Sequence, residues 1–522
     1  MTYDALMTDA TITDASSLWD LLEQRVQLSP DRPMLIDPSE DRTVTFAEFK
    51  NRAERVAAGF AEMGIGEGSP VTWVLPTRIE TVVASFALSR LGAVQNPIIH
   101  IYRDREVGFC IRQTEAQMVL VPGTWAGFDY TAMVERVTSE AGMSPSILEA
   151  YNTLPEGDPE TLAPVPVATA DAPTRWIYYT SGTTSDPKGV RHSDATLIAG
   201  GLGLAQALDM SADDVGSIAF PYAHIGGPDY MVTMLSSGFP ALLIEKFVLD
   251  DVIASLNTYG ATMAGGSTAF YTMFLNEQRK NPDTPLIPSL RLLSGGGAPK
   301  PPEVFYEVKA EMGIPVSHGY GMTECPMIAQ GSPHDSDEQL AHTEGHSVLG
   351  CEVSVVGDDG SDLTPGEVGE IRVAGPMVFQ GYTDPTLMDA AFDDQGRFRT
   401  GDLGVMTADG HITLTGRLKD VIIRKGENIS AKEVEDVLYA HPSVGAVAVI
   451  GLPDAERGER VCAVVETAPG AEPLEHDAMV AACVDAGLMK QKIPEQLVLK
   501  EVLPRNATLK ILKHELRAEL TD

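Results

Sequence analysis

Residues 179–190 have the sequence YTSGTTSDPKGV. They follow a predicted strand, WIYYT at 176–180, and gather hydroxyl side chains around one glycine before Pro-Lys-Gly. Hydroxyls and loop N–H groups are the donors that a polyphosphate needs, and Lys188 adds a cation. This is not a Walker loop, because its lysine precedes the glycine. A solvated turn rich in serine and threonine is the structural alternative. The phosphate-binding interpretation uses Thr180, Ser181, Gly182, Thr183, Thr184 and Lys188.

Strands and helices are predicted to alternate on both sides of this loop. Upstream, strands at 71–76 and 94–101 enclose a helix at 79–91, and such a βαβ unit favours a parallel sheet covered by helices. Another helix is predicted over 45–63 from its apolar spacing. Downstream strands are predicted at 215–221, 241–247, 261–265 and 290–293. From about residue 344 to 414, short strands alternate with Asp-Gly and Pro-Gly turns, which indicates an antiparallel region.

The pattern changes after GRLKD at 416–420. Helices are predicted at 431–438, near 478–486 and from about 511, with strands at 444–451 and 461–466. About 100 residues are enough for a separate core. We therefore predict an α/β protein in two parts. Residues 1–418 form a large domain, with two αβ-layered subdomains of parallel sheet and a small antiparallel β-rich region from about 344. Residues 419–522 form a small α+β domain.

Two glycine-rich segments follow predicted strands. In SGGGAP (294–299), bare backbone lets a flat ring approach, because glycine has no Cβ in the way; a generic turn is the alternative. In GYGMTE (319–324), Tyr320 could stack on a base, Thr323 could bond a phosphate, and Glu324 could hold Mg²⁺ through a hard oxygen. A core tyrosine followed by a helix-capping Thr/Glu pair is the alternative for this second segment.

Two later features also bear on an anionic ligand. TGD at 400–402 is interpreted as an acid at a strand end, where the Asp402 carboxylate could accept both ribose hydroxyls; an isolated structural turn is the alternative. Between residues 490 and 517 there are seven Lys or Arg residues and three Glu. This excess of positive charge is unusual in an acidic chain, and a solvated helix face explains only part of it.

Composition narrows the class of protein. Of the 522 residues, 43% are hydrophobic and 21% are charged, as in ordinary globular proteins. The formal net charge of −36 repels a phosphate backbone, so we expect no nucleic-acid partner. Five cysteines without CxxC pairing indicate neither a disulfide framework nor a zinc site. With no signal-peptide pattern and no apolar run of about 18 residues, we expect a cytoplasmic protein without an integral membrane segment.

Taken together, these motifs resemble the acyl-adenylate-forming superfamily of acyl-CoA synthetases, nonribosomal adenylation domains and beetle luciferases. The resemblance covers residues 17 to 517, with the motifs in family order. YTSGTTSDPKGV is similar to the family's phosphate loop, and SGGGAP to its adenine motif. GYGMTE is similar to its Mg²⁺ motif and TGD to its ribose motif. GRLKD with KGENISAKEVE (425–435) resembles the hinge and the motif beyond it, and PRNATLKILKHELR (504–517) resembles the terminal catalytic-lysine motif.

The resemblance implies an acyl-CoA synthetase. A carboxylic acid attacks ATP to give acyl-AMP and pyrophosphate, and the thiol of coenzyme A then gives acyl-CoA and AMP. It implies a mobile lid that turns about Lys419 and presents different residues in each half-reaction. The roles that it assigns are catalysis by Lys510, Thr323 and Glu324, with Glu324 as the Mg²⁺ ligand; adenine and ribose binding by Gly296, Gly297, Ala298, Tyr320, Asp402 and Arg417; and CoA contact by Lys425, Gly426 and Glu427.

Two residues depart from the family pattern. Ser185 stands where the phosphate loop usually has glycine, and Leu509 stands where glycine usually precedes the catalytic lysine. Leucine disfavours a positive φ by about 1–2 kcal/mol, so the loop that carries Lys510 is expected to close more slowly or differently. The Leu509→Gly change is predicted to raise or preserve the adenylation rate.

The acid substrate is predicted less sharply. PYAHIGG (221–227) matches a family segment whose histidine lies between the acyl pocket and the thiol tunnel, which indicates His224; a buried, satisfied histidine is the alternative. Gly295 and Cys325 are predicted to line the same tunnel. Because these segments carry no Lys or Arg for a second anionic group, we expect a hydrophobic monocarboxylic acid, either a medium-to-long fatty acid or a bulky cyclic or steroid-derived one.

Two other functions stay open at this point. The adenylate could be passed to an acyl carrier protein instead of CoA, although no carrier domain follows residue 522. The chain could also be a nucleotide-binding homologue with weakened adenylation, as Ser185 and Leu509 suggest. The expected partners are the acid, ATP and CoA, and a homodimer is left open.

Overall fold

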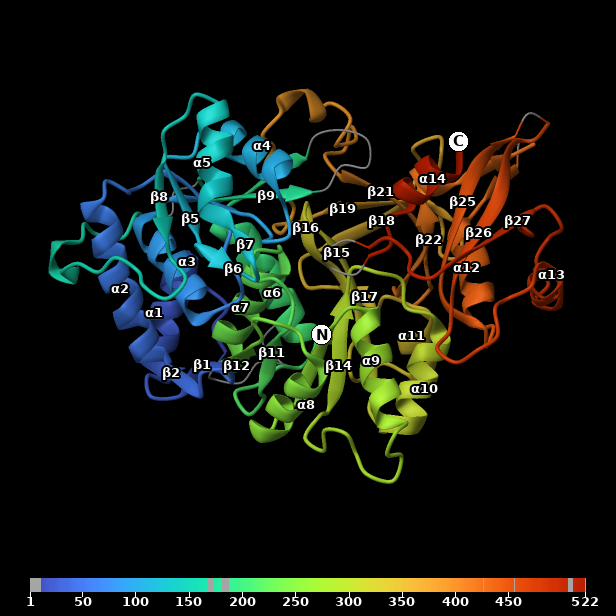
Figure 1. Cartoon of the computed structure of the whole chain (residues 1–522), viewed down its shortest axis with the longest axis horizontal. Helices are drawn as coiled ribbons and strands as arrows, with labels where there is room; N and C mark the ends of the chain where they lie inside the picture. The colour runs from blue at the N-terminus through green and yellow to red at the C-terminus, as the bar shows by residue number, and fades with distance from the viewer. Residues whose placement is uncertain are drawn as a thin grey trace.

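The strand predicted before the phosphate loop, β9 (Trp176–Thr180), lies inside a mixed sheet of the computed structural model (Figure 1). The structure describes residues 11–167, 172–180, 187–425, 427–454, 456–505 and 510–521. The strand order of this sheet is β20-β10-β9-β4-β3-β5-β8. The strands from β9 to β8 run parallel, and β10 and β20 are antiparallel additions. The other members are β3 (Pro70–Trp73), β4 (Val94–Pro97), β5 (Met118–Val121), β8 (Ser146–Glu149), β10 (Lys188–His192) and β20 (Gly381–Tyr382).

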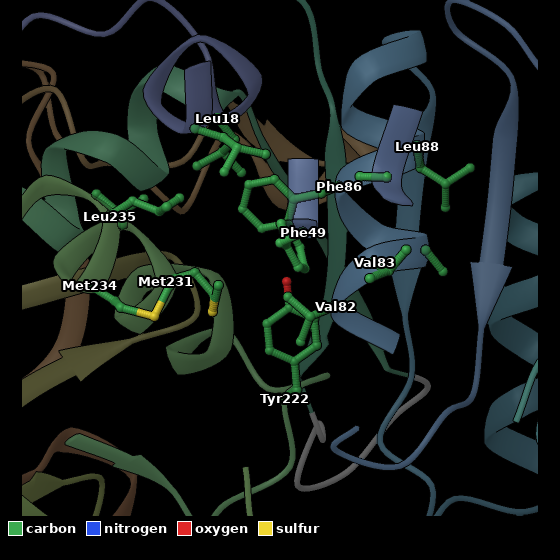
Figure 2. Close-up of a cluster of buried hydrophobic side chains, with 14 of the residues drawn as sticks. Leu18, Phe49, Val82, Val83, Phe86, Leu88, Tyr222, Met231, Met234 and Leu235 are labelled. Atoms are coloured by element: carbon green, nitrogen blue, oxygen red, sulfur yellow. The ribbon is translucent and has the colours of Figure 1, made fainter. Parts of the chain in front are cut away.

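Helices cover both faces of this sheet. On one face a large apolar cluster joins the sheet to side chains from distant parts of the sequence, including Leu18, Phe49, Phe86 and Leu235 (Figure 2). The helices of this face are α1 (Leu18–Leu28), α2 (Phe46–Glu62), α3 (Ile79–Leu91), α6 (Asp194–Ala207) and α7 (Gly226–Ser237). The opposite face carries α4 (Asp104–Thr114) and α5 (Tyr130–Glu140), with the small ribbon of β6 (Thr124–Trp125) and β7 (Phe128–Asp129).

A second αβ layer lies beside the first (Figure 1). One of its sheets has the order β13-β14-β15-β16-β17, and another has the order β11-β12-β1-β2. Their strands are β1 (Pro33–Asp37), β2 (Arg42–Thr45), β11 (Gly216–Ile218), β12 (Ala241–Leu243), β13 (Met263–Gly266), β14 (Leu292–Gly296), β15 (Val316–Met322), β16 (Cys325–Gln330) and β17 (His346–Ser347). The helices are α8 (Leu249–Thr258), α9 (Thr268–Gln278), α10 (Pro302–Met312) and α11 (Asp337–His342).

The predicted β-rich region is an antiparallel sheet of order β18-β19-β21-β22. Its strands are β18 (Glu352–Val356), β19 (Gly369–Ala374), β21 (Phe398–Met406) and β22 (Ile412–Arg417). A short 3-10 helix, η4 (Leu418–Asp420), follows β22 at the predicted hinge.

The C-terminal part has its own sheet and its own apolar clusters. The sheet order is β24-β23-β26-β25, and β27 pairs parallel with β26. Its strands are β23 (Ile422–Arg424), β24 (Glu427–Ile429), β25 (Val444–Asp454), β26 (Gly458–Thr467) and β27 (Gln496–Lys500), and its helices are α12 (Ala431–Tyr439), α13 (His476–Asp485) and α14 (Lys513–Thr521). The α/β fold class, with a large N-terminal and a small C-terminal part, is confirmed. Among the described residues, none of the helices has both the length and the apolar character needed to cross a bilayer.

Several strands are shorter than predicted. Apolar runs at 71–76, 94–101, 215–221 and 241–247 give strands of three or four residues. The reason is that strand pairing ends where a neighbouring strand ends, whereas the chain stays buried as it continues in a loop. Val74 and Leu75 illustrate this, since both are buried although they lie beyond the end of β3.

Candidate active site

The phosphate-loop motif begins in β9 and ends in β10, and these two strands form an antiparallel pair. Thr180 and Lys188 lie opposite each other in this antiparallel pair. Ser181, Gly182, Thr183 and Thr184, together with Ser185, lie outside the described residues. The Lys188 ammonium lies 5.3 Å from the centre of the Tyr382 ring on β20, within cation–π distance. The hairpin therefore holds the predicted cation beside an aromatic ring.

Thr323 and Glu324 form the two-residue turn between β15 and β16, where Met322 pairs with Cys325. This excludes the helix-capping alternative. The Tyr382 hydroxyl donates to Glu324 Oε1 at 2.8 Å. Burial raises the pKa of Glu324, and Tyr382, Lys188 and Arg417 oppose that rise. Glu324 is thus a buried carboxyl that nearby cations favour in its charged form.

A buried histidine holds the backbone of the same turn. His192 Nε2 lies 2.7 Å from the Thr323 carbonyl oxygen, and Nδ1 lies 2.8 Å from the Thr196 hydroxyl. Only an N–H can donate to a carbonyl, so Nε2 carries the proton and Nδ1 accepts. Burial lowers the pKa of His192 to about 4, so the ring is neutral near pH 7.

Asp402 lies within β21 instead of at a strand end, which corrects the sequence interpretation. A bulge in the β21–β22 pairing falls beside it, and Arg417 lies opposite on β22. The Arg417 Nε donates to Asp402 Oδ1 at 2.8 Å, and the Tyr320 hydroxyl donates to Oδ2 at 2.7 Å. Each carboxylate oxygen keeps a lone pair for a ligand hydroxyl. The Tyr320 ring is only 5% exposed, so most of its surface packs in the protein core.

The glycines of SGGGAP differ in what surrounds them. A Cβ on Gly295 would lie 2.6 Å from the backbone of Gly266, and one on Gly296 would lie 2.6 Å from the Gly319 carbonyl, so both permit close packing of parallel strands. Gly297 has a φ of +78° and open space where its Cβ would point. Of these three glycines, Gly297 is the one that presents bare backbone to a ligand.

A second buried histidine fixes the end of this motif. His318 Nε2 donates to the Ala298 carbonyl at 2.8 Å, and the Tyr271 hydroxyl lies 3.2 Å from Nδ1. Burial and the nearby Lys300 lower the pKa of His318 to about 3. This neutral ring therefore holds Ala298 in place without adding charge.

Cations from both parts of the chain meet near Asp402. Burial lowers the pKa of Lys510 to about 8, and the charges that act on it are Arg417, Asp402, Lys419 and Asp420. Burial likewise lowers the pKa of Lys419, which lies within electrostatic range of Arg417, Asp402 and Lys188. This chain with a net charge of −36 thus gathers positive charge at one place, as an anionic ligand requires. Leu509 lies outside the described residues.

His224 borders a small cavity of about 20 Å³, room for about one water molecule. Its Nδ1 accepts the Gly226 N–H at 3.2 Å, and burial lowers its pKa to about 4. Thr323 lines the same cavity, together with aromatic and aliphatic residues that include Ile98, Tyr178 and Ala223. His224 is therefore a neutral ring with one nitrogen satisfied.

Cys325 does not line this cavity. Its side chain is fully buried in the cluster that contains Met327, Ile328 and Cys351. Gly295 packs against Gly266, as described above. Both residues were predicted to line the tunnel, and in this structure both are packing residues.

The predicted CoA residues lie apart from this site. Lys425 and Glu427 are exposed at the tip of the β23–β24 hairpin, and Lys425 has a φ of +52°. Gly426 lies outside the described residues. In this arrangement of the two parts, Lys510 is half-buried near Asp402, whereas the hairpin tip is exposed.

Comparison with known proteins shows the family of the chain. The AMP-binding enzyme family model matches residues 22–383, and the AMP-binding enzyme C-terminal domain model matches residues 433–510. The chain belongs to the AMP-binding enzyme family. The medium-chain fatty-acid–CoA ligase of Escherichia coli (strain K12) is 30% identical over 97% of this chain and 90% of its own length. The 2-succinylbenzoate–CoA ligase of Bacillus subtilis (strain 168) is 31% identical over 95% of this chain and 97% of its own length.

A solved relative is similar to this chain over nearly its full length. ATP-bound MatB from Rhodopseudomonas palustris has a TM-score of 0.87 at 27% identity and covers 98% of this chain and 99% of its own. The apo form of the same protein gives 0.77 at the same coverage and identity. The present chain is thus an AMP-forming acid–CoA ligase, whose small-molecule substrates are a carboxylic acid, ATP and CoA.

Three positioning residues of this ligase were missed from the sequence. Tyr382 holds Glu324, His192 holds the Thr323 carbonyl, and His318 holds the Ala298 carbonyl. His192 follows the phosphate motif by two residues and His318 precedes GYGMTE by one, so adjacency to a motif was the available signal. Tyr382 carries no such signal.

Proposed function

We propose that this ligase activates a hydrophobic monocarboxylic acid, a medium-to-long fatty acid or a bulky cyclic one, as its acyl-AMP and then transfers the acyl group to CoA. The observation that carries the proposal is the position of Lys510, half-buried and within electrostatic range of Asp402 and Arg417. Lys510 comes from the C-terminal part, and the Asp402–Arg417 pair comes from the large part. A cation in this position is suited to stabilise an α-phosphate that lies between the acid and the ribose.

The first half-reaction places a carboxylate oxygen on the α-phosphorus of ATP and breaks the bond to pyrophosphate. Charge spreads over the α-phosphate oxygens, so donors fixed in advance give the largest stabilisation. We assign Lys510 to the α-phosphate and the acid, Lys188 and the 180–184 loop to the outer phosphates, and Asp402 with Arg417 to the ribose. Thr323 adds a hydroxyl beside the acid cavity, and Gly296, Gly297, Ala298 and Tyr320 border the adenine.

A magnesium ion is part of the proposal, and Glu324 is its assigned protein ligand. Among the described residues there is no group of three His, Cys, Asp or Glu side chains placed to hold a metal. This fits Mg²⁺, which usually takes one or two carboxylates and completes its shell with phosphate oxygens and water. The carboxyl of Glu324, held by Tyr382 and near Lys188, is the hard oxygen donor for this role. When bound, the ion would neutralise phosphate charge.

The second half-reaction attaches the CoA sulfur to the acyl carbon, breaks the bond to AMP and releases the thiol proton to solvent. We propose that residues 419–522 turn about Lys419 and exchange Lys510 for Lys425, Gly426 and Glu427. The exposed hairpin tip in the present arrangement is consistent with this exchange. Arg417 ends β22 and Lys419 sits in the short helix that follows, where few backbone hydrogen bonds need to break.

The preference for a hydrophobic acid rests on the residues that line the cavity beside His224. This cavity is only about 20 Å³ in the present structure, so an acyl chain has to displace some of the side chains around it. Its lining is mainly aliphatic and aromatic and includes no Lys, Arg, Asp or Glu. A second carboxylate or a phosphate would be buried there without a counter-charge, which is costly. His224, neutral at physiological pH, supplies at most one hydrogen bond to the acyl end.

ATP–pyrophosphate exchange over a panel of acids tests the proposal. The panel contains fatty acids of increasing length, cyclic and steroid-derived acids, and dicarboxylates of matched length. We expect exchange with hydrophobic acids and at least tenfold less with the dicarboxylates, because burying an unpaired charge costs more than about 1.4 kcal/mol. Exchange restricted to dicarboxylates would overturn the substrate class. Mass spectrometry then distinguishes acyl-CoA from a loaded acyl carrier protein, and carrier loading without acyl-CoA would overturn the assigned acceptor.

A further inference from the structure

Helix α12 lies between the sheet of the C-terminal part and the large domain (Figure 1). One face of the helix packs in its own domain, with Ala431, Val434 and Leu438 buried in the cluster of β23, β25 and β26. The contacts on its other sides are not explained by that core. They join α12 to the large domain at both ends and to the lysine segment in between.

The C-terminal end of α12 enters the apolar core of the large domain. Tyr439 packs against the cluster of its own domain and also against the cluster built by α9 and α10. Burial raises the pKa of the Tyr439 hydroxyl, and contact with the Thr272 side chain on α9 opposes that rise. Because Tyr439 packs against the apolar clusters of both parts, we expect it to contribute strongly to the contact between them.

The N-terminal end of α12 meets buried charges of the large domain. Lys432 pairs with Asp436 at 2.6 Å and also lies in the field of Glu344. Glu344 is 8% exposed, and its Oε2 accepts the Leu414 N–H at 2.8 Å. Lys300 is 6% exposed and donates to the Ala341 carbonyl at 2.6 Å. These charges line one groove of about 1190 Å³ between the two parts, so charges of alternating sign face each other across it.

The middle of α12 is tied to the segment that carries Lys510. Glu435 forms an ion pair with Lys513 at 2.7 Å, and its Oε1 also accepts the Val449 N–H at 2.6 Å. Lys513 begins α14, three residues beyond Lys510. An isolated antiparallel bridge pairs Arg505 with Ile511, the residue that follows Lys510. A displacement of α12 relative to the large domain therefore moves the Lys510 segment with it.

We propose that α12 is the docking element that holds this ligase in its adenylating arrangement, with Tyr439, Lys432 and Glu344 as positioning residues for Lys510. The inference rests on the two half-reactions of the proposed function. A turn of the small part about Lys419 separates Tyr439 from α9 and Lys432 from Glu344, because the partners lie on opposite sides of the hinge. These contacts therefore favour one arrangement, and losing them shifts the population away from it.

Two half-reactions measured separately test the docking role. Tyr439→Ala is expected to lower ATP–pyrophosphate exchange by about tenfold, the effect of about 1.4 kcal/mol on the arrangement. Formation of acyl-CoA from added acyl-AMP and CoA should stay within about twofold or rise, since that half-reaction uses the other arrangement. Tyr439→Phe, which keeps the ring, should retain most of the exchange. Equal loss in both half-reactions, or no loss in either, would overturn the docking role.

A second variant guards against simple unfolding. Glu344→Gln keeps an acceptor for the Leu414 N–H but removes the charge that faces Lys432. Exchange should fall by about threefold, because one of the charges that attract Lys432 is lost while the Lys432–Asp436 pair remains, and Tm should change little. Glu472→Ala, at an exposed site of the small part outside the basic segment, is the matched control and should change neither half-reaction. If wild-type enzyme shows no exchange with any acid, the proposed function fails; if Lys510→Ala abolishes exchange but the α12 variants do not lower it, only the docking role fails.

Discussion

On the side that we assign to the nucleotide, Glu324 and Asp402 have partners at 2.7–2.8 Å; on the side that we assign to the acid, the described residues give His224 one hydrogen-bond partner, the Gly226 N–H at 3.2 Å. The nucleotide side is built from charges and fixed donors, and the acid side from apolar walls. Fixed donors suit a ligand that is the same in every turnover. Apolar walls specify size more than identity, because a methylene is worth only about 1–3 kcal/mol in discrimination.

The largest expected effect is the loss of ATP–pyrophosphate exchange when Lys510 is replaced, because this change affects the nucleotide side alone. Lys510→Ala should lower ATP–pyrophosphate exchange by on the order of 10²–10³-fold, the loss typical of one donor to a transition-state anion. Acyl-CoA formation from added acyl-AMP should be nearly unchanged. Radiolabelled pyrophosphate measures the first reaction and mass spectrometry the second, with Glu472→Ala as the control. A modest loss of exchange would mean that the nucleotide side does not depend on this cation.

Next in size is the ribose pair. Asp402→Asn keeps the shape of the side chain but removes the negative charge to which Arg417 and Tyr320 donate their hydrogen bonds. A hydrogen bond to a charged group contributes about 1.5–3 kcal/mol, so KM for ATP should rise by roughly 10–100-fold while KM for the acid changes little. Steady-state kinetics with each substrate varied gives both values. Asp394→Asn, at an exposed site of the same domain, should leave both values unchanged.

The pH dependence should also come from the nucleotide side. Lys510 acts as a cation, and its pKa in the ligand-free protein is lowered to about 8 by burial. Its charged form is present below that value, so kcat/KM for ATP should be flat near pH 7 and fall about tenfold per pH unit well above 8. Lys510→Arg, which keeps its charge, should move the decline to higher pH. His224, with a pKa lowered to about 4, should add no transition between pH 6 and 9.

The smallest effect belongs to the acid side. Ala223 is 2% exposed and lines the cavity beside His224. Ala223→Leu should lower kcat/KM for bulky acids about tenfold relative to short ones, as expected for a few methylenes of lost space. KM for ATP should stay within about twofold. Competition between a long and a short acid, read by mass spectrometry of the CoA products, measures the ratio directly. An equal loss for both acids would place Ala223 outside the acyl path.

Sequence reasoning located residues that are neighbours in the chain and that the structure also brings near one another. Lys188, the Thr323–Glu324 pair and Asp402 were each singled out in a contiguous motif, and all lie near the gathered cations, although Asp402 lies within a strand and not at its end. Their roles stay predictions. Sequence reasoning failed where partners meet only in the fold. Tyr382 reaches Glu324 across 58 residues and His192 reaches Thr323 across 131. No local spacing encodes such contacts.

The direction in which a side chain points was the second limit. Cys325 follows Glu324 directly, but as the first residue of β16 it faces the core, while the turn residue before it faces the cations. Gly295 and Gly297 stand two residues apart, yet one meets a neighbouring strand and the other open space. Strand register settles both cases, and register is fixed by pairing with distant strands.

In the proposed mechanism, the turn made by Thr323 and Glu324 connects the acid cavity to the assigned Mg²⁺ ligand through one peptide bond. One residue borders the cavity for the acid, and its neighbour is held among the cations by Tyr382. An oversized acid that pushes on Thr323 also displaces the Glu324 carboxylate beside it. Such an acid should still bind in the cavity but should not support ATP cleavage. We therefore expect this ligase to discriminate against oversized acids more through slow catalysis than through weak binding.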